Sequence, residues 1–327
     1  MGLPNNTDLL KRRLPTGEKN LITDLDGIRV GHATLHQGDI HTGVTIVSPR
    51  KNIYPNPLPA ACHVINGFSK PIGFIQVDEL GTIESPIGLT NTFAIGTLAD
   101  GLIKRVVKEQ SDVNNQIGSF NSVVMECNDS YLSDMKSFPV LPEHVTAAFD
   151  DLSIDFLEGD VGAGSGMVCY GLKGGIGSSS RIIDIKGKTY TLGCLVLTNF
   201  GQPDDLILRD RLDLPANYLS KDQTGSVVIV LASDAPLDHR QLKRISRRAQ
   251  SGLARTGAYV SHGSGEIVLA FSTDRSSDRL IDPDLDRLFL ATVEAVEESV
   301  LSSLWHANSV VGYHNRRVLA LKDVLTP

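Results

Sequence analysis

The chain has 327 residues, of which 41% are hydrophobic and 21% are charged. This composition is typical of a globular protein with enough apolar material for a large core. The formal net charge is −7 and no long basic stripe occurs, which argues against nucleic acid as a partner. No apolar run reaches the ~18 residues of a membrane helix, and the polar residues 1–20 lack the apolar centre of a signal peptide. We expect a cytoplasmic protein with a flexible arm over residues 1–20.

Strand-like runs rich in Val, Ile and Leu recur along the chain, and several lack the alternation of a half-exposed strand. Such runs predict strands that are buried on both faces, as in sheets covered by helices. The expected strands are 28–34, 43–47, 63–65, 122–126, 167–171, 191–199, 226–232 and 266–272. Capping residues and helical spacing predict helices at 91–108, 143–156, 237–254 and 284–306.

The densest glycine region covers residues 159–180 and invites interpretation as a phosphate-binding loop. A Walker A loop requires Ser or Thr after its lysine, but Gly174 follows Lys173. The dinucleotide fingerprint requires glycine where Met167 stands. The alternatives left open are close backbone packing and a site wall that a substrate main chain approaches.

The cysteines and histidines give little support for a metal site. Three histidines, His32, His36 and His41, lie close in sequence, but in a strand-and-turn segment their side chains need not converge. The four cysteines are far apart without a C-x-x-C pair, which indicates buried free thiols at positions 62, 127, 169 and 194. We therefore expect no metal and no cofactor.

Gly225-Ser226 opens directly onto the apolar run VVIVL, after a polar, turn-rich segment. No G-x-S-x-G elbow occurs in the chain. A chain that cuts itself before Ser226 would free an α-amine with a reference pKa near ~8, which can take the hydroxyl proton. Glycine before the cut tolerates the distortion of an N-to-O acyl shift. Local chemistry alone leaves four other Gly-Ser pairs as alternatives, at residues 118–119, 164–165, 177–178 and 263–264.

The segment that begins at Gly225-Ser226 and continues VVIVLASDAPL resembles the nucleophile strand of the P1 peptidases. That family contains the L-aminopeptidase/D-Ala-esterase/amidase enzymes and the β-peptidyl aminopeptidases. The resemblance extends in family order over residues 22–34 (ITDLDGIRVGHAT), 41–45, 63–97, 124–134 (VMECNDSYLSD), 159–181, 195–201 (LVLTNFG) and 263–272 (GSGEIVLAFS). It therefore covers nearly the whole chain after the N-terminal arm.

The resemblance implies an α/β layered sandwich of the αββα type, with N-terminal-nucleophile hydrolase architecture. It implies a single catalytic domain over residues 21–327, cut by the chain itself into 1–225 and 226–327. It also implies that the two cleaved chains stay associated and assemble as a homo-oligomer.

The resemblance further implies roles for particular residues. Ser226 matches the nucleophile and Asn199 matches the oxyanion-hole asparagine. Such an amide donor can lower the activation barrier by roughly 3–4 kcal/mol. Tyr131 matches a tyrosine near the oxyanion and substrate. Ser264 and Glu266 match residues that orient and polarise the nucleophile. Without the resemblance, Asn199 and Ser264 read as turn residues and Tyr131 as a core aromatic.

Glu126 lies in a matching segment, where a carboxylate would meet the substrate ammonium and select free N-termini. The implied activity is an aminopeptidase that removes N-terminal residues from small peptides, amino-acid amides and esters, with D- and β-amino acids among the substrate classes. One alternative is an acyltransferase like ornithine acetyltransferase, although that group uses threonine at the cut. The other is a non-catalytic binding protein on the same fold.

Overall fold

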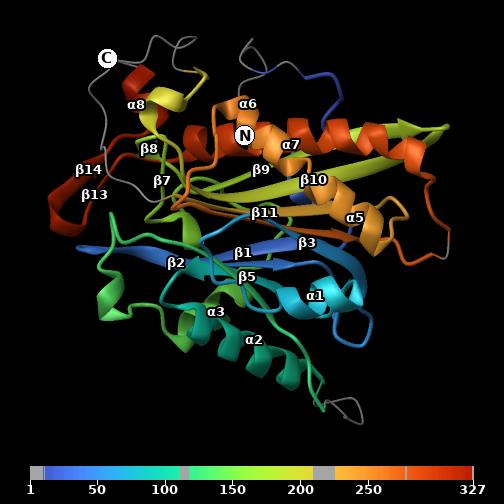
Figure 1. Ribbon diagram of the computed structural model, residues 1–327. Coiled ribbons are helices and arrows are strands. Elements are labelled where there is room, and N and C mark those ends of the chain that lie inside the picture. Colours follow the sequence, from blue (N-terminus) through green and yellow to red (C-terminus); the bar gives the residue numbers. More distant parts are fainter. Residues whose placement is uncertain (1–9, 11, 111–117, 209–224, 277, 326–327) are drawn as a thin grey trace.

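The computed structural model describes residues 10, 12–110, 118–208, 225–276 and 278–325. Two β-sheets lie face to face, with helices on their outer faces (Figure 1). The smaller sheet has the order β1-β2-β5-β6, formed by β1 (Arg29–Gln37), β2 (Ile40–Ser48), β5 (Ile87–Asn91) and β6 (Val123–Cys127). The larger has the order β4-β3-β12-β11-β10-β9, formed by β3 (Leu58–Gly67), β4 (Thr82–Ile83), β9 (Ile176–Ile185), β10 (Lys188–Asn199), β11 (Ser226–Ser233) and β12 (Gly265–Ser272).

Helices α2 (Ile95–Gln110) and α3 (Pro142–Asp150) cover the smaller sheet. The larger sheet is covered by α5 (His239–Ser246), α6 (Ala249–Thr256) and α7 (Leu285–His306). The αββα sandwich expected from the sequence is therefore confirmed (Figure 1). Smaller elements are α1 (Phe74–Leu80), α8 (Leu321–Leu325) and two short hairpins, β7 (Val168–Cys169) with β8 (Leu172–Lys173) and β13 (Val310–Gly312) with β14 (Arg316–Val318). No helix among the described residues is both long and apolar enough to cross a membrane.

Strand β11 shows why the apolar runs lack alternation. Val228 and Val230 point into the core between the two sheets, whereas Val227 and Ile229 point into the core beneath α5, α6 and α7. Both faces of the strand are therefore dry, and every position favours an apolar side chain. The first residue of this buried strand is Ser226.

Strand β9 was not predicted, because its first half reads Gly and Ser rather than Val and Ile. The reason is its closeness to α7. A Cβ atom at Gly177 would lie 1.9 Å from the carbonyl oxygen of Ser299, and Ser179 Oγ bonds to the carbonyl of Ala295 at 2.8 Å. Small residues let the helix and the strand pack in direct contact. The first half of β9 therefore lacks the Val and Ile residues from which a strand is predicted.

The helix expected over 91–108 corresponds to α2, which begins only at Ile95 because Asn91 still belongs to β5. Two further helix predictions differ more in length. The helix expected over 143–156 ends at Asp150, because Ser153 exchanges two backbone hydrogen bonds with Val30 of β1. The helix expected over 237–254 is broken into α5 and α6 by a turn at Arg247 and Arg248, where the Arg248 N–H donates to Ile245 at 2.9 Å. Such an i-to-i−3 bond tightens the turn and redirects the axis.

The flexible arm expected over residues 1–20 is described only in part, since residues 1–9 and 11 lie outside the described ranges. Arg12 pairs with the buried carboxylate of Glu298 at 2.5 Å, and the Leu14 N–H donates to Glu294 at 3.2 Å. Both glutamates lie on α7 and also bind the buried Arg181. Residues 12–20 are thus anchored because they complete a buried charge network.

Among the three histidines, His32 is held through both ring nitrogens, since Thr45 Oγ1 lies 2.9 Å from Nδ1 and the Leu157 carbonyl 3.1 Å from Nε2. Burial lowers the pKa of His32 to about 4. The unfolded imidazole titrates near ~6.5. The unfolded chain therefore binds the proton first as the pH falls, and the stability from neutral His32 is lost between about pH 6.5 and 4.

We expect the free energy of unfolding to fall by ~2 kcal/mol across this range on account of His32, less than the full pKa shift gives because the ring is partly exposed. Urea titrations at several pH values would measure it. A His32→Gln protein should show a shallower fall, and identical slopes in the two proteins would contradict the assignment.

Candidate active site

Three strands of the larger sheet bring distant parts of the chain to one point. In the register of the sheet, Asn199 at the end of β10 pairs with Ser226, and Ser226 pairs with Gly265 at the start of β12. Ser264 and Glu266 flank Gly265. Four of the residues that the sequence singled out therefore lie together where three neighbouring strands inside the larger sheet begin or end, and all four are buried.

The Ser226 hydroxyl faces two nitrogen donors. Asn199 Nδ2 lies 3.3 Å from Ser226 Oγ, and the backbone nitrogen of Asn128 lies 3.4 Å from it. The Asn199 amide is fixed at both ends, since Nδ2 also donates to the Asn128 carbonyl at 2.8 Å and Oδ1 accepts from the Val168 N–H at 3.1 Å. These partners determine which end of the amide is nitrogen. Two nitrogen donors thus converge on Ser226 Oγ, the oxygen that would attack a carbonyl.

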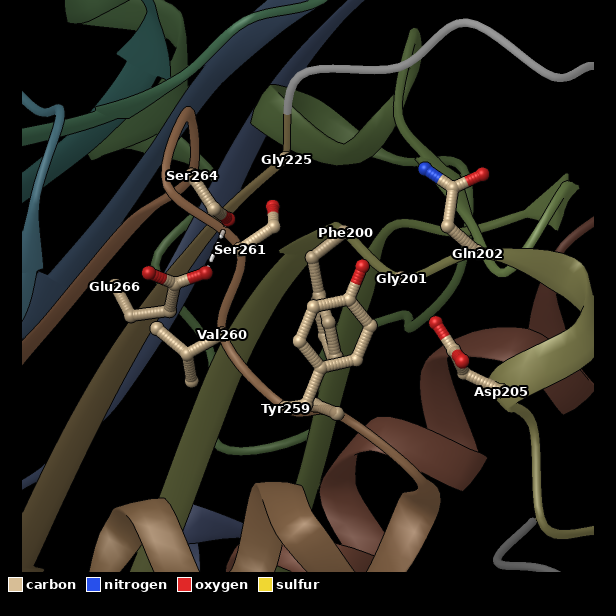
Figure 2. A pocket seen from close by; sticks show the side chains of 11 residues that line it. Phe200, Gly201, Gln202, Asp205, Gly225, Tyr259, Val260, Ser261, Ser264 and Glu266 are labelled. Atoms are coloured by element: carbon tan, nitrogen blue, oxygen red, sulfur yellow. Dashed lines mark hydrogen bonds between the residues drawn. The ribbon is translucent and has the colours of Figure 1, made fainter.

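Gly225 lies against Ser264 in a small cavity that is also lined by Phe200, Asp205 and Tyr259 (Figure 2). A Cβ atom at Gly225 would approach Ser264 Oγ to 2.6 Å, so the position accepts no side chain without displacement. The Gly225 carbonyl oxygen accepts a hydrogen bond from the Gly265 N–H at 3.0 Å. The carbonyl of the bond expected to break is therefore already held by a donor.

Ser264 Oγ donates to Glu266 Oε1, and the two side chains face each other in the cavity (Figure 2). Among the described residues, Glu266 Oε2 is buried without a hydrogen-bond partner. Burial raises the pKa of Glu266, and the bond from Ser264 partly offsets this. A carboxylate with one free oxygen is suited to accept a proton-bearing group that arrives later.

Glu126, at the end of β6, is buried with three donors. Ser69 Oγ and the Lys70 N–H each lie 3.1 Å from Oε1, and Thr92 Oγ1 donates to Oε2. A Cβ atom at Gly265 would lie 3.0 Å from the Ser69 Cβ, so this group of residues adjoins the strand pair that holds Ser226. The structure thus places Glu126 beside the site, although not in contact with the nucleophile.

Tyr131 is placed differently from the other predicted residues. Arg316 of β14 stacks over its ring, with the guanidinium 4.7 Å from the ring centroid, and also donates to the Tyr131 carbonyl at 3.0 Å. No contact described for Tyr131 joins its hydroxyl to Ser226.

Two groups that shape the site are not indicated by the sequence analysis. The Asn128 backbone N–H is one, since a main-chain donor has no residue signature. The other is Asn66 on β3, whose Nδ2 donates to the carbonyls of Ser261 and Ser264 and so fixes the loop before β12. The feature of the sequence that could have indicated Asn66 is its polar side chain near the end of a largely apolar strand.

No group of three His, Cys, Asp or Glu side chains with the arrangement of a metal site occurs within the described ranges. His36 and His41 are in edge-to-face ring contact, with centroids 4.3 Å apart.

Residues 20–318 match the Peptidase family S58. The chain belongs to this family. It is 32% identical to the β-peptidyl aminopeptidase BapA of Sphingosinicella microcystinivorans, over 93% of this chain and 86% of that protein. Among solved structures, the PH0078 protein of Pyrococcus horikoshii OT3 superposes with a TM-score of 0.88 at 43% identity, over 97% of this chain and 96% of that one.

The L-aminopeptidase D-Ala-esterase/amidase of Ochrobactrum anthropi superposes with a TM-score of 0.87 at 31% identity, over 95% of this chain and 93% of that one. Its structure is described as a variant of the N-terminal-nucleophile hydrolase fold and a prototype for serine aminopeptidases. The S58 chain described here is accordingly a serine-type aminopeptidase with that fold, and the family resemblance seen in the sequence is confirmed.

Proposed function

We propose that this chain cuts its own Gly225–Ser226 bond and then uses Ser226 to remove N-terminal residues from small peptides, amino-acid amides and esters. The observation that carries the proposal is the placing of Ser226 Oγ. It is buried at the first position of a central strand, within 3.3 Å of Asn199 Nδ2 and 3.4 Å of the Asn128 nitrogen.

Self-cleavage begins when Ser226 Oγ attacks the carbonyl carbon of Gly225. The Gly265 N–H, 3.0 Å from the carbonyl oxygen, stabilises the negative charge that forms there. The C–N bond then breaks and an ester joins Gly225 to Oγ, while the proton that Oγ gives up passes to the nitrogen, which becomes the α-amine of Ser226. Water hydrolyses the ester, leaving a carboxylate on 1–225 and a free Ser226 hydroxyl on 226–327.

In peptide hydrolysis the freed α-amine takes the Oγ proton as Oγ attacks the acyl carbon of the substrate. Asn199 Nδ2 and the Asn128 N–H stabilise the oxyanion, and the leaving amine departs with the proton. Water then releases the acyl group. The unpaired Oε2 of Glu266 is available to accept from the α-ammonium, with Ser264 orienting the carboxylate.

Glu126 supplies the selection for free N-termini in this proposal, since its buried carboxylate attracts a substrate ammonium. Tyr131 is proposed to contact the substrate, as the family resemblance implies. The names of the relatives suggest substrates with β-amino acids, L-amino acids and D-Ala esters or amides.

Glu126→Gln should keep the hydrogen-bonding shape and remove the charge. We expect kcat/KM for aminoacyl p-nitroanilides to fall by roughly 10- to 100-fold, mainly through KM. N-acetylated substrates, which carry no ammonium, provide the control and should be hydrolysed equally slowly by both proteins. An unchanged KM for the free-amine substrates would remove Glu126 from the proposal.

Two measurements test the function as a whole. A denaturing gel should show two chains, the smaller with the N-terminal sequence SVVIVLAS. The processed protein should hydrolyse at least one class in a panel of L-, D- and β-aminoacyl amides. An uncut chain that is inert towards the whole panel would overturn the proposal.

We further propose a cytoplasmic homo-oligomer of cleaved heterodimers. Supporting this, α1 and the preceding loop expose the apolar side chains of Phe68, Ile75 and Leu80, which contact between copies would bury. The four cysteines are free thiols, in keeping with a reducing compartment. Light scattering after gel filtration tests the assembly, and a mass of one processed chain pair would exclude it.

A further inference from the structure

Lys173 is a buried lysine that the proposed chemistry does not use. It lies on β8, and its side chain is fully enclosed. Nζ donates to three backbone carbonyls, those of Gly164, Met167 and Gly174, each at 2.9 Å. Within the described part of the chain, no carboxylate forms an ion pair with it at 4.0 Å or less. Burying an ammonium group without a counter-ion costs free energy, which suggests that Lys173 has a role of its own.

The three acceptors define the state of the side chain. An ammonium has three N–H donors, and each finds one carbonyl oxygen, whereas a neutral amine would leave a lone pair facing an oxygen. Burial lowers the pKa of Lys173 to about 7, and Asp160 and Asp129 oppose that shift. The geometry around Nζ selects the charged form.

One of the three carbonyls belongs to a peptide group that also contacts the site. The Met167 carbonyl accepts from Lys173 Nζ, and the N–H at the other end of the same peptide, on Val168, donates to Asn199 Oδ1 at 3.1 Å. Asn199 Nδ2 in turn lies 3.3 Å from Ser226 Oγ. A continuous series of donors and acceptors thus runs from the ammonium through one peptide and one side-chain amide to the nucleophile.

The glycine-rich segment around Lys173 is held tightly enough to transmit this arrangement. A Cβ atom at Gly174 would lie 2.6 Å from the Thr198 carbonyl, next to Asn199, and one at Gly164 would lie 2.6 Å from the Gly159 carbonyl. The missing side chains let the segment close around Nζ and pack on the end of β10. Hydrogen bonds in series polarise one another in a dry interior.

We propose that Lys173 is a positioning residue for the oxyanion site: its ammonium fixes and polarises the Met167–Val168 peptide, which orients the Asn199 amide and strengthens its N–H groups as donors towards Ser226. The inference rests on the proposed roles of Ser226 and Asn199. This role would explain why a lysine lies in a glycine-rich segment that does not fit the pattern of a phosphate-binding loop.

The test is Lys173→Met, which keeps the length of the side chain and removes the charge. On the processed enzyme we expect kcat to fall roughly 10- to 50-fold with KM changed less than about two-fold, because only oxyanion stabilisation is weakened. If the methionine variant does not fold, Lys173→Gln is used instead, because it changes the polarity less. The same loss of kcat is expected.

A double-mutant cycle separates positioning from a merely structural role. In an Asn199→Ala background, Lys173→Met should lower kcat less than about two-fold further, because its effect passes through Asn199. Arg181→Met is the matched control: it removes another buried cation, bound by Glu294 and Glu298, and should lower Tm but not kcat per processed site.

An unchanged kcat, or losses that multiply in the double mutant, would overturn the inference while leaving the proposed function intact. A wild-type protein that is uncut and inactive would overturn both.

Discussion

Ser226→Ala protein is expected to remain a single uncut chain and to lose at least about 10⁴-fold in hydrolysis of aminoacyl p-nitroanilides. The proposed chemistry uses this hydroxyl twice, first on the Gly225 carbonyl and then on the substrate. It also uses the α-amine that only the first reaction creates. Removing one oxygen atom therefore blocks both reactions, and the smaller alanine fits the buried position at the start of β11.

Gel electrophoresis and N-terminal sequencing follow the cut, and initial rates follow the hydrolysis. Ser119→Ala is the control, because Ser119 also follows a glycine but lies exposed. It should be processed normally. If Ser226→Ala still released a chain beginning at residue 226, or if it retained substantial hydrolysis, the nucleophile would lie elsewhere.

The layers of the fold could be predicted because β10, β11 and β12 are buried on both faces and read as apolar runs. Strand β9 could not be predicted, because its close contact with α7 requires Gly and Ser at positions where Val and Ile would indicate a strand. The anchoring of residues 12–20 was missed for a related reason. Its partner, the charge network of Arg181 and two glutamates, is assembled from segments more than 100 residues apart.

At the site, the family resemblance picked out Asn199, Ser264 and Glu266, and the sheet register explains how they meet Ser226. What the sequence could not supply was the Asn128 N–H, because every residue has such a group and only the fold aims it. In the sequence, Lys173 stands out only as the lysine of an incomplete phosphate-loop pattern. Its role depends on a peptide carbonyl that no sequence pattern records.

Asn199→Ala should lower kcat by roughly 10²- to 10³-fold, equivalent to about 3–4 kcal/mol of transition-state stabilisation, with little change in KM. In the proposed mechanism this donor stabilises charge that exists only after Oγ has attacked, so substrate binding should not depend on it. The Asn128 N–H remains and accounts for the residual rate.

Asn199→Asp separates donation from packing. An aspartate keeps an oxygen for the Val168 N–H and the same shape, but it has no N–H for the oxyanion and places a carboxylate beside it. We expect a loss at least as large as that of the alanine variant, measured as kcat on processed protein whose Tm is compared in parallel. Full activity in Asn199→Asp would mean that Asn199 only holds the end of β10. The Asn128 N–H would then be the donor that stabilises the oxyanion.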